Sequence, residues 1–391
     1  MRQLKYPLKL LFLVILFLAL CAGMFSFIPL FGVCTYVLLF LMLFFMFAEN
    51  QFSVKKYFCI FILAFLWLTA LLVIKRLGTF AGLYAWFLGG MIVFSLTLME
   101  RFDTDSVWLF LFCSFMISLF FCLIEMCTGF HLPTSRFSKL SLVVKSYFGL
   151  YVPSFYFTNE NDFCGYFVVA FFLCRLIDHC HRLIYDIFLF PIVFFIIFIA
   201  GARLCMIALF VYYFFIIMMH VPKKKRAWLY IVATIIVAFV FLKYALPYIS
   251  NMRNAGSAKS LIIRVNLLIV SLQNIFVQHN FLGLGPSSFP SIIGSSSMTS
   301  DIIDPHNWFM ELAIEAGLPF LILYIYFILT YLRHEKCKEY KATFIAFLIC
   351  NFCSSRFSGI LWNWFFLAFF VKRFFLISRK EKCCSDYSKD M

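Results

Sequence analysis

Residues 183–220 read LIYDIFLFPIVFFIIFIAGARLCMIALFVYYFFIIMMH. Within this stretch only Asp186, Arg203 and the final His220 are acidic or basic, and the two apolar runs meet at Gly201 with almost no polar loop between them. Each run approaches the ~20 apolar residues that an α-helix needs to cross the hydrocarbon of a bilayer. The stretch therefore predicts two membrane-spanning helices joined by a tight turn.

The rest of the chain has the same character. Of its 391 residues, 64% are apolar and 13% are charged, whereas soluble domains have about 45–50% and about 25%. This composition excludes a soluble protein and a disordered one. We therefore predict an all-α, polytopic membrane helix bundle that forms a single integral membrane domain over 1–391. The length rule predicts about twelve transmembrane helices, at 8–24, 29–48, 57–74, 79–98, 106–126, 163–178, 183–201, 204–220, 227–246, 317–332, 342–355 and 358–375.

The net charge of +15 has two interpretations, a nucleic-acid partner or an orientation signal for a membrane protein. If the N-terminus is inside and the spans alternate, about two thirds of the 33 Lys and Arg fall on the inner side, Arg175 and Arg182 among them. Inner loops rich in basic residues are typical of multi-pass proteins. We therefore expect cytoplasmic N- and C-termini, a phospholipid membrane as a partner, and no nucleic acid.

Two segments on the predicted outer side are too long to be simple connectors. They cover 127–162 and 247–316, and the second precedes the tenth predicted span and should carry short helices. Loops of this length are uncommon in compact domains and usually functional. We therefore expect the active-site face on the extracytoplasmic side.

The second outer segment ends with a helix signature. Asp304 fits an N-cap, Pro305 the first helical position and Gly317 the left-handed residue past the end. His306 would then lie in the first turn, where free N–H groups and the helix dipole favour an anion. A histidine there can act as a general base or donate a hydrogen bond to a phosphate. The alternative is a polar interfacial residue without a chemical role.

Several arginines are candidates for binding an anionic ligand. Arg203 stands in the tight turn, Arg264 lies early in the second outer loop, and Arg356 separates the last two spans. A charge beside the bilayer is costly and by default marks a site, and the guanidinium fork suits phosphate. The alternative, strongest for Arg356, is that the side chain extends to lipid headgroups.

Two further motifs are short. In Gly283-Leu284-Gly285-Pro286 the proline makes a dinucleotide-binding turn improbable, so we expect the glycines to allow close approach to a ligand or to another backbone. In Asn159-Glu160-Asn161-Asp162 the polar residues fit a helix cap, and they also have the groups to bind sugar hydroxyls.

In this order, the motifs resemble those of the O-antigen ligase and polysaccharide polymerase superfamily of bacterial envelope proteins. The similar positions are Glu125-x-x-Thr128-Gly129-Phe130-His131-Leu132-Pro133, 159–163, Gly201-Ala202-Arg203, Arg264, Gly283-x-Gly285-x-x-x-Phe289, and His306-Asn307-x-x-x-Glu311 followed by Gly317-Leu318-Pro319. Two positions depart from the family pattern: Ala202 stands where a serine is usual, and Ser287 where a third glycine is often found.

The resemblance implies a metal-independent glycosyltransferase without a cofactor, built as a membrane-embedded bundle in the cytoplasmic (inner) membrane. Its donor would be an oligosaccharide on undecaprenyl diphosphate. His306 would be catalytic, and Arg203 and Arg264 would bind the diphosphate. The further candidates, for glycan or acceptor binding, are Asn161, Asp162, Asn307, Glu311, Arg136 and Arg356.

The expected reaction is polymerisation of lipid-linked repeat units into O-antigen, capsule or exopolysaccharide, with a chain-length regulator protein as a further partner. A ligase that transfers the finished glycan to a lipid core shares the donor and remains an alternative. A lipid-linked glycan flippase is the alternative of another class. It should carry charges at mid-span and show repeat symmetry, which this sequence lacks.

Overall fold

A computed structural model describes residues 6–22, 30–48, 55–98, 104–132, 149–157, 159–178, 180–220, 228, 232, 243, 265–294, 307–352 and 356–387. The regular elements in these parts of the chain are all helices, joined by turns and loops, and none of these parts forms a β-strand element. The all-α class expected from the sequence is thus confirmed for the described residues.

The helices follow the predicted spans closely. They are α1 (Tyr6–Leu20), α2 (Phe31–Ala48), α3 (Lys55–Lys75), α4 (Phe80–Leu98), α5 (Thr104–Thr128), α6 (Glu160–Ile177), α7 (Arg182–Ile184), the π-helix η3 (Tyr185–Leu189), α8 (Phe190–Ala200), α9 (Arg203–His220), the π-helix η5 (Gln273–Val277), α13 (Phe289–Gly294), α14 (Trp308–Glu315), α15 (Leu318–His334), α16 (Lys338–Asn351) and α17 (Leu361–Tyr387). Each predicted span other than 227–246 coincides with a helix or with consecutive helical segments. Most of 227–246 lies outside the described residues.

Length and hydropathy support a helical membrane protein. Two helical stretches, Val107–Thr128 and Arg182–Ala200, are long and apolar enough to cross a bilayer, and shorter apolar helices accompany them. The total of twelve spans stays a prediction.

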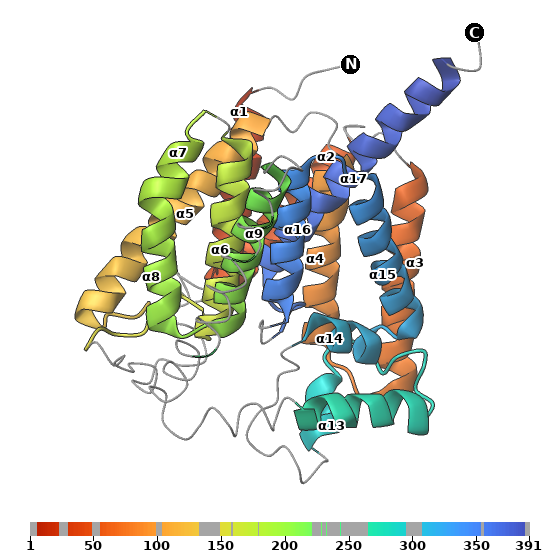
Figure 1. The fold of residues 1–391 in the computed structure, drawn as a ribbon. Coiled ribbons are helices and arrows are strands. Elements are labelled where there is room, and N and C mark those ends of the chain that lie inside the picture. The colour runs from red at the N-terminus through yellow and green to blue at the C-terminus, as the bar shows by residue number, and fades with distance from the viewer. Residues whose placement is uncertain are drawn as a thin grey trace.

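Helix α6 forms the centre of the bundle. Its side chains are buried almost continuously from Asp162 to Leu176, which is typical of a helix surrounded by other helices. Aromatic rings fill the space around it: Phe115 of α5 stacks on Phe167 with ring centroids 4.8 Å apart, and Phe172 stacks on Tyr212 of α9 at 3.8 Å. Around this core α4 packs on α17 and α16 packs on α9 (Figure 1).

A proline explains the π-helix between α7 and α8. Pro191 has no N–H to donate to a preceding carbonyl, so the regular ladder cannot continue through it. In the π segment before it, the Phe190 N–H bonds to the Tyr185 carbonyl, a wider turn than in an α-helix. This segment carries Asp186.

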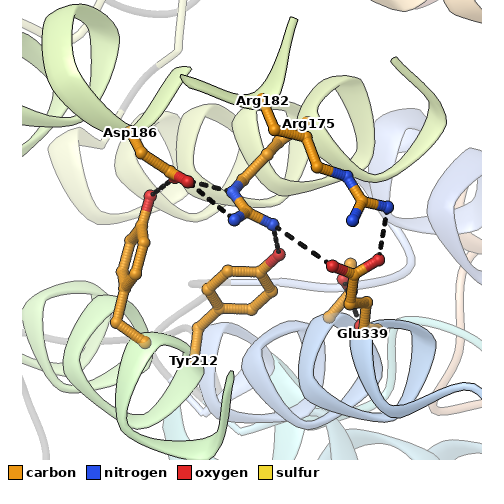
Figure 2. Close-up of polar contacts among 7 residues, drawn as sticks. Arg175, Arg182, Asp186, Tyr212 and Glu339 are labelled. Atoms are coloured by element: carbon orange, nitrogen blue, oxygen red, sulfur yellow. Dashed lines mark hydrogen bonds and ion pairs between the residues drawn. The ribbon is translucent and has the colours of Figure 1, made fainter. Parts of the chain in front are cut away.

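Asp186 and Arg175 form a polar connection between helices (Figure 2). Arg175 Nε and Nη2 each donate to one Asp186 oxygen at 2.7 Å, and Arg175 Nη1 donates to the Tyr212 hydroxyl at 3.0 Å. Beside them, Arg182 Nη2 donates to Glu339 of α16 at 2.5 Å. A buried guanidinium needs such partners. Arg175 and Arg182, which the sequence suggested only as orientation signals, therefore also join α6, η3, α9 and α16.

The bundle has two distinct ends. Helices α13 and α14 lie at one end, and the C-terminal part of α17 extends from the other (Figure 1). The C-terminal end of α5 and the beginning of α6, which border the first predicted outer loop, lie at the α14 end. Both predicted outer loops therefore border the same end of the bundle, as an alternating topology requires.

Candidate functional site

Helix α14 begins three residues later than the sequence predicted. Its N-cap is Asn307, whose Oδ1 accepts hydrogen bonds from the N–H groups of Phe309 at 2.9 Å and Met310 at 3.4 Å. The prediction of Asp304 as the cap, with His306 in the first helical turn, is therefore wrong. Asn and Asp are caps of similar strength, and the structure uses the second of the two.

Two acidic residues lie one turn apart on α14, and both are fully buried. Glu311 accepts from the N–H of Phe357 at 2.8 Å, and from the N–H of Ser358 at 3.1 Å and its hydroxyl. Glu315 accepts from the indole N–H of Trp86 at 2.9 Å. The carboxylates thus anchor α14 to α4 and to the segment that precedes α17.

Burial raises the pKa of both carboxyl groups, because the charged form loses hydration. The Glu311 carboxylate raises the pKa of Glu315 further, while the nearby Arg356 acts in the opposite direction. Glu315 is therefore the member of the pair that holds a proton more readily.

Arg356 connects this pair to the loop before α13. One of its Nη atoms donates to the Ser287 hydroxyl and lies 3.8 Å from Glu315 Oε1. Its side chain is 24% exposed, so it lies partly at the surface while it faces protein partners rather than lipid alone. We refer to Ser287, Glu311, Glu315, Arg356 and Ser358 as the α14 cluster.

The two glycines of the Gly283-Leu284-Gly285 motif allow a close backbone contact. The N–H groups of Leu284 and Gly285 donate to the carbonyls of Ile314 and Glu315 at 2.8 and 3.0 Å. Gly283 has φ +96°, and a Cβ there would lie 2.7 Å from the Gly317 nitrogen. Of the two interpretations from the sequence, approach to another backbone is therefore the one confirmed.

Of the other predicted site residues, the structure describes Arg203, Asn161 and Asp162 and leaves three arginine and histidine candidates undescribed. Arg203 is the first residue of α9 and follows Gly201, a left-handed cap of α8, and the buried Ala202. Asn159 caps α6 by accepting from the Asn161 N–H at 2.8 Å, and Asp162 is buried in the first turn. His306, Arg264 and Arg136 lie outside the described residues.

The structure therefore brings together Glu311 and Arg356 of the predicted set, with Asn307 one turn before Glu311. Sequence reasoning missed Ser287 and Glu315 as their partners. A signal was present for Glu315, since it lies four residues after Glu311 and so on the same helical face. No signal in the sequence indicates the pairing with Ser287.

The raised pKa of Glu315 leads to a prediction about stability and pH. A carboxyl group with a higher pKa in the folded state contributes stability at low pH, which is lost as the pH rises above its ordinary value of 4.5. We expect Glu315→Gln, which keeps an oxygen for Trp86, to reduce the fall in melting temperature between pH 5 and pH 8. The reduction should be about 1 °C for each kcal/mol of ionisation cost removed, because the entropy of unfolding scales with the length of the chain.

Thermal unfolding of the detergent-solubilised protein at the two pH values measures this effect. Glu311→Gln is the matched control, because an amide placed against the Phe357 and Ser358 N–H groups should lower stability at both pH values. An unchanged pH slope in Glu315→Gln would contradict the prediction.

Comparison with known proteins identifies one region of the chain. Residues 188–325 match the model of the family described as O-antigen ligase. This match confirms the resemblance to the O-antigen ligase and polymerase superfamily, whose members are integral to bacterial membranes. No curated protein and no solved structure gives a significant match to the chain.

Proposed function

We propose that this protein polymerises lipid-linked oligosaccharide repeat units into a surface polysaccharide on the outer face of the bacterial cytoplasmic membrane. The observation that carries the proposal is the family match, because residues 188–325 include Arg203, Arg264, His306 and Glu311. The donor is an oligosaccharide on undecaprenyl diphosphate, and the product is O-antigen, capsule or exopolysaccharide.

The diphosphate leaving group requires positive charge at the reaction centre. Arg203 and Arg264 supply it in place of a metal by stabilising the charge that develops as the sugar–phosphate bond breaks. The position of Arg203 in the first turn of α9 supports this role, since the N–H groups of a helix N-terminus also favour an anion. His306 either removes the proton from the acceptor hydroxyl or helps to hold the diphosphate.

The remaining predicted residues have supporting roles. Arg356 is the member of the α14 cluster that reaches the surface, so it is our first candidate for contact with the glycan or the acceptor. Asn161, Asp162 and Arg136 are further candidates on the acceptor side. The side chains of Asn307 and Glu311 bond to backbone N–H groups, which favours a structural contribution from both.

A ligase is the second candidate, because it uses the same donor and the matched family is described as O-antigen ligase. The two reactions differ in their acceptor, which is another lipid-linked repeat for the polymerase and a lipid core sugar for the ligase. Our preference for the polymerase rests on the resemblance of the segment 125–163 to polymerases.

Deletion of the gene separates the candidate functions. We expect single lipid-linked repeats to accumulate on the outer face while long-chain polysaccharide disappears, as analysed by lipid extraction and gel electrophoresis. Accumulation of lipid-linked polymer would instead indicate a ligase. Repeats that remain on the inner face would indicate a flippase and contradict the proposal.

A further inference from the structure

A second polar cluster lies at the C-terminal end of α5, separate from the α14 cluster. The Gly129 N–H donates to the Glu125 carbonyl at 2.8 Å, and Gly129 has φ +71°, so the chain turns back at the end of the helix. This turn brings His131 against Glu125, with Nδ1 2.7 Å from Oε1.

The Glu125 carboxylate is held by several donors and is buried. Its Oε2 accepts from the N–H groups of Ser154 at 3.0 Å and Phe155 at 2.7 Å. The Ser154 hydroxyl lies 3.1 Å from His131 Nδ1. Because a carboxylate only accepts, the contact places a proton on Nδ1, so that Nε2 is an acceptor when the imidazole is neutral.

His131 Nε2 has no hydrogen-bond partner among the described residues, although the atom is buried. The imidazole as a whole is 12% exposed, so its ring reaches the surface at one edge. A buried polar atom without a partner is rare in folded proteins and calls for an explanation. A ligand that displaces the atoms now burying Nε2 and donates a hydrogen bond to it would explain why this atom has no partner within the described part of the protein.

The surroundings favour a neutral ligand over an anion. Glu125, immediately behind the imidazole, would repel a phosphate, whereas a hydroxyl group can donate to Nε2. Phe130, the neighbour of His131, is 58% exposed, and the Tyr151 ring packs against Gly129. Hydrogen-bonding groups beside the exposed ring of Phe130 suit a ligand that has both hydroxyl groups and C–H surfaces, as sugars do.

Two hydrogen bonds and two short chain segments link this cluster to the α14 cluster. Phe155, held by Glu125, precedes Tyr156, whose hydroxyl accepts from the indole N–H of Trp362 at 2.7 Å. Trp362 lies in the first turn of α17, four residues after Ser358 of the α14 cluster. The two clusters are therefore joined through the protein interior by the buried Tyr156 and Trp362.

We propose that His131, held in place by Glu125, binds a hydroxyl group of the sugar chain through Nε2. His131 is a binding residue in this proposal and takes no part in proton transfer. The choice of a sugar as the ligand rests on the proposed function, whereas the acceptor character of Nε2 rests on the contact of Nδ1 with Glu125 in the neutral imidazole.

The test compares His131→Asn with the wild-type protein, because the Asn amide can still donate to Glu125 but offers no acceptor at the position of Nε2. The probe is the single repeat unit, released from the surface polysaccharide of the producing cell, together with analogues that each lack one hydroxyl. We expect His131→Asn to bind the repeat unit about tenfold more weakly, the loss of one hydrogen bond. One deoxy analogue should bind the wild type about tenfold more weakly and His131→Asn no more weakly than the parent sugar.

His181→Asn is the matched control. His181 also pairs with an acid through Nδ1, at 2.9 Å from Asp178, but its side chain is 62% exposed. We expect its binding of the repeat unit to remain at the wild-type level. This control separates the effect of the His131 site from a general effect of replacing a paired histidine.

Equal binding by His131→Asn and the wild type, or equal weakening of every analogue, would overturn the inference. The binding of the deoxy analogues to the wild-type protein tests the inference even if the variant does not fold. If the wild type binds all of these analogues equally well, the inference is also overturned. Transfer from the lipid diphosphate donor is measured on the same samples. If the protein transfers sugar from the donor but His131→Asn binds the repeat unit as the wild type does, only this inference is refuted. If binding depends on His131 but no sugar is transferred, only the proposed function is refuted.

Discussion

His306→Ala is expected to lower polymer formation by about 10²- to 10⁴-fold, the usual contribution of a general base. The variant should still insert into the membrane, because the substitution removes no apolar surface from a predicted span. The measurement is the yield of long-chain polysaccharide per amount of protein in the membrane fraction. Single lipid-linked repeats should accumulate at the same time. Normal long-chain polymer from this variant would contradict the assignment of His306.

Kinetics on the purified variant separate the two roles left open for His306. If the imidazole removes the acceptor proton, kcat falls and the KM for the lipid diphosphate donor stays close to the wild-type value. If it holds the diphosphate, the donor KM rises as well. His181→Ala is the control, because His181 is exposed and lies beyond the last turn of α6, at the opposite end of that helix from the first outer segment. It should leave both constants unchanged.

Most of the fold could be predicted because span length is a local property of the sequence. An uninterrupted apolar run must satisfy its backbone polar groups internally, so it forms a helix wherever it lies in a bilayer. For this reason α3 and α15 coincide with their predicted spans to within about two residues. The start of α14 was mispredicted because Asp304 and Asn307 are equivalent caps in the sequence, and only packing decides between them.

The polar contacts of the site could not be predicted, since they join segments far apart in the chain. Glu311 meets Phe357 and Ser358, and Arg356 meets Ser287. No periodicity in the sequence encodes such pairs, which form only when α14 and α17 are packed. The bond between Arg175 and Asp186 joins residues that are closer in the chain, but its acidic partner lies in the π-helix before Pro191, which the sequence did not predict. Residue types at turns indicated the candidates, and the tertiary structure determines their partners.

Arg203→Lys is expected to lower the rate of sugar transfer by about 10- to 100-fold, although the charge is kept. An arginine presents two parallel N–H groups to a phosphate, and a lysine presents a single compact charge. Loss of one charge-assisted hydrogen bond costs about 1.5–3 kcal/mol, which corresponds to that range of rates. Arg203 begins α9 directly after the buried Ala202, so the backbone position of the new side chain is fixed.

The control for this substitution is Arg76→Lys, an exposed arginine at the end of α3. It tests the same chemical change at a position for which we propose no contact with the diphosphate. The transfer rate of this variant should match that of the wild type. Arg203→Ala completes the series: if the fork and the charge both act on the leaving diphosphate, its rate should fall below that of Arg203→Lys. Full turnover with lysine at position 203 would mean that this residue only anchors the turn to lipid headgroups, and the diphosphate would then need another cation.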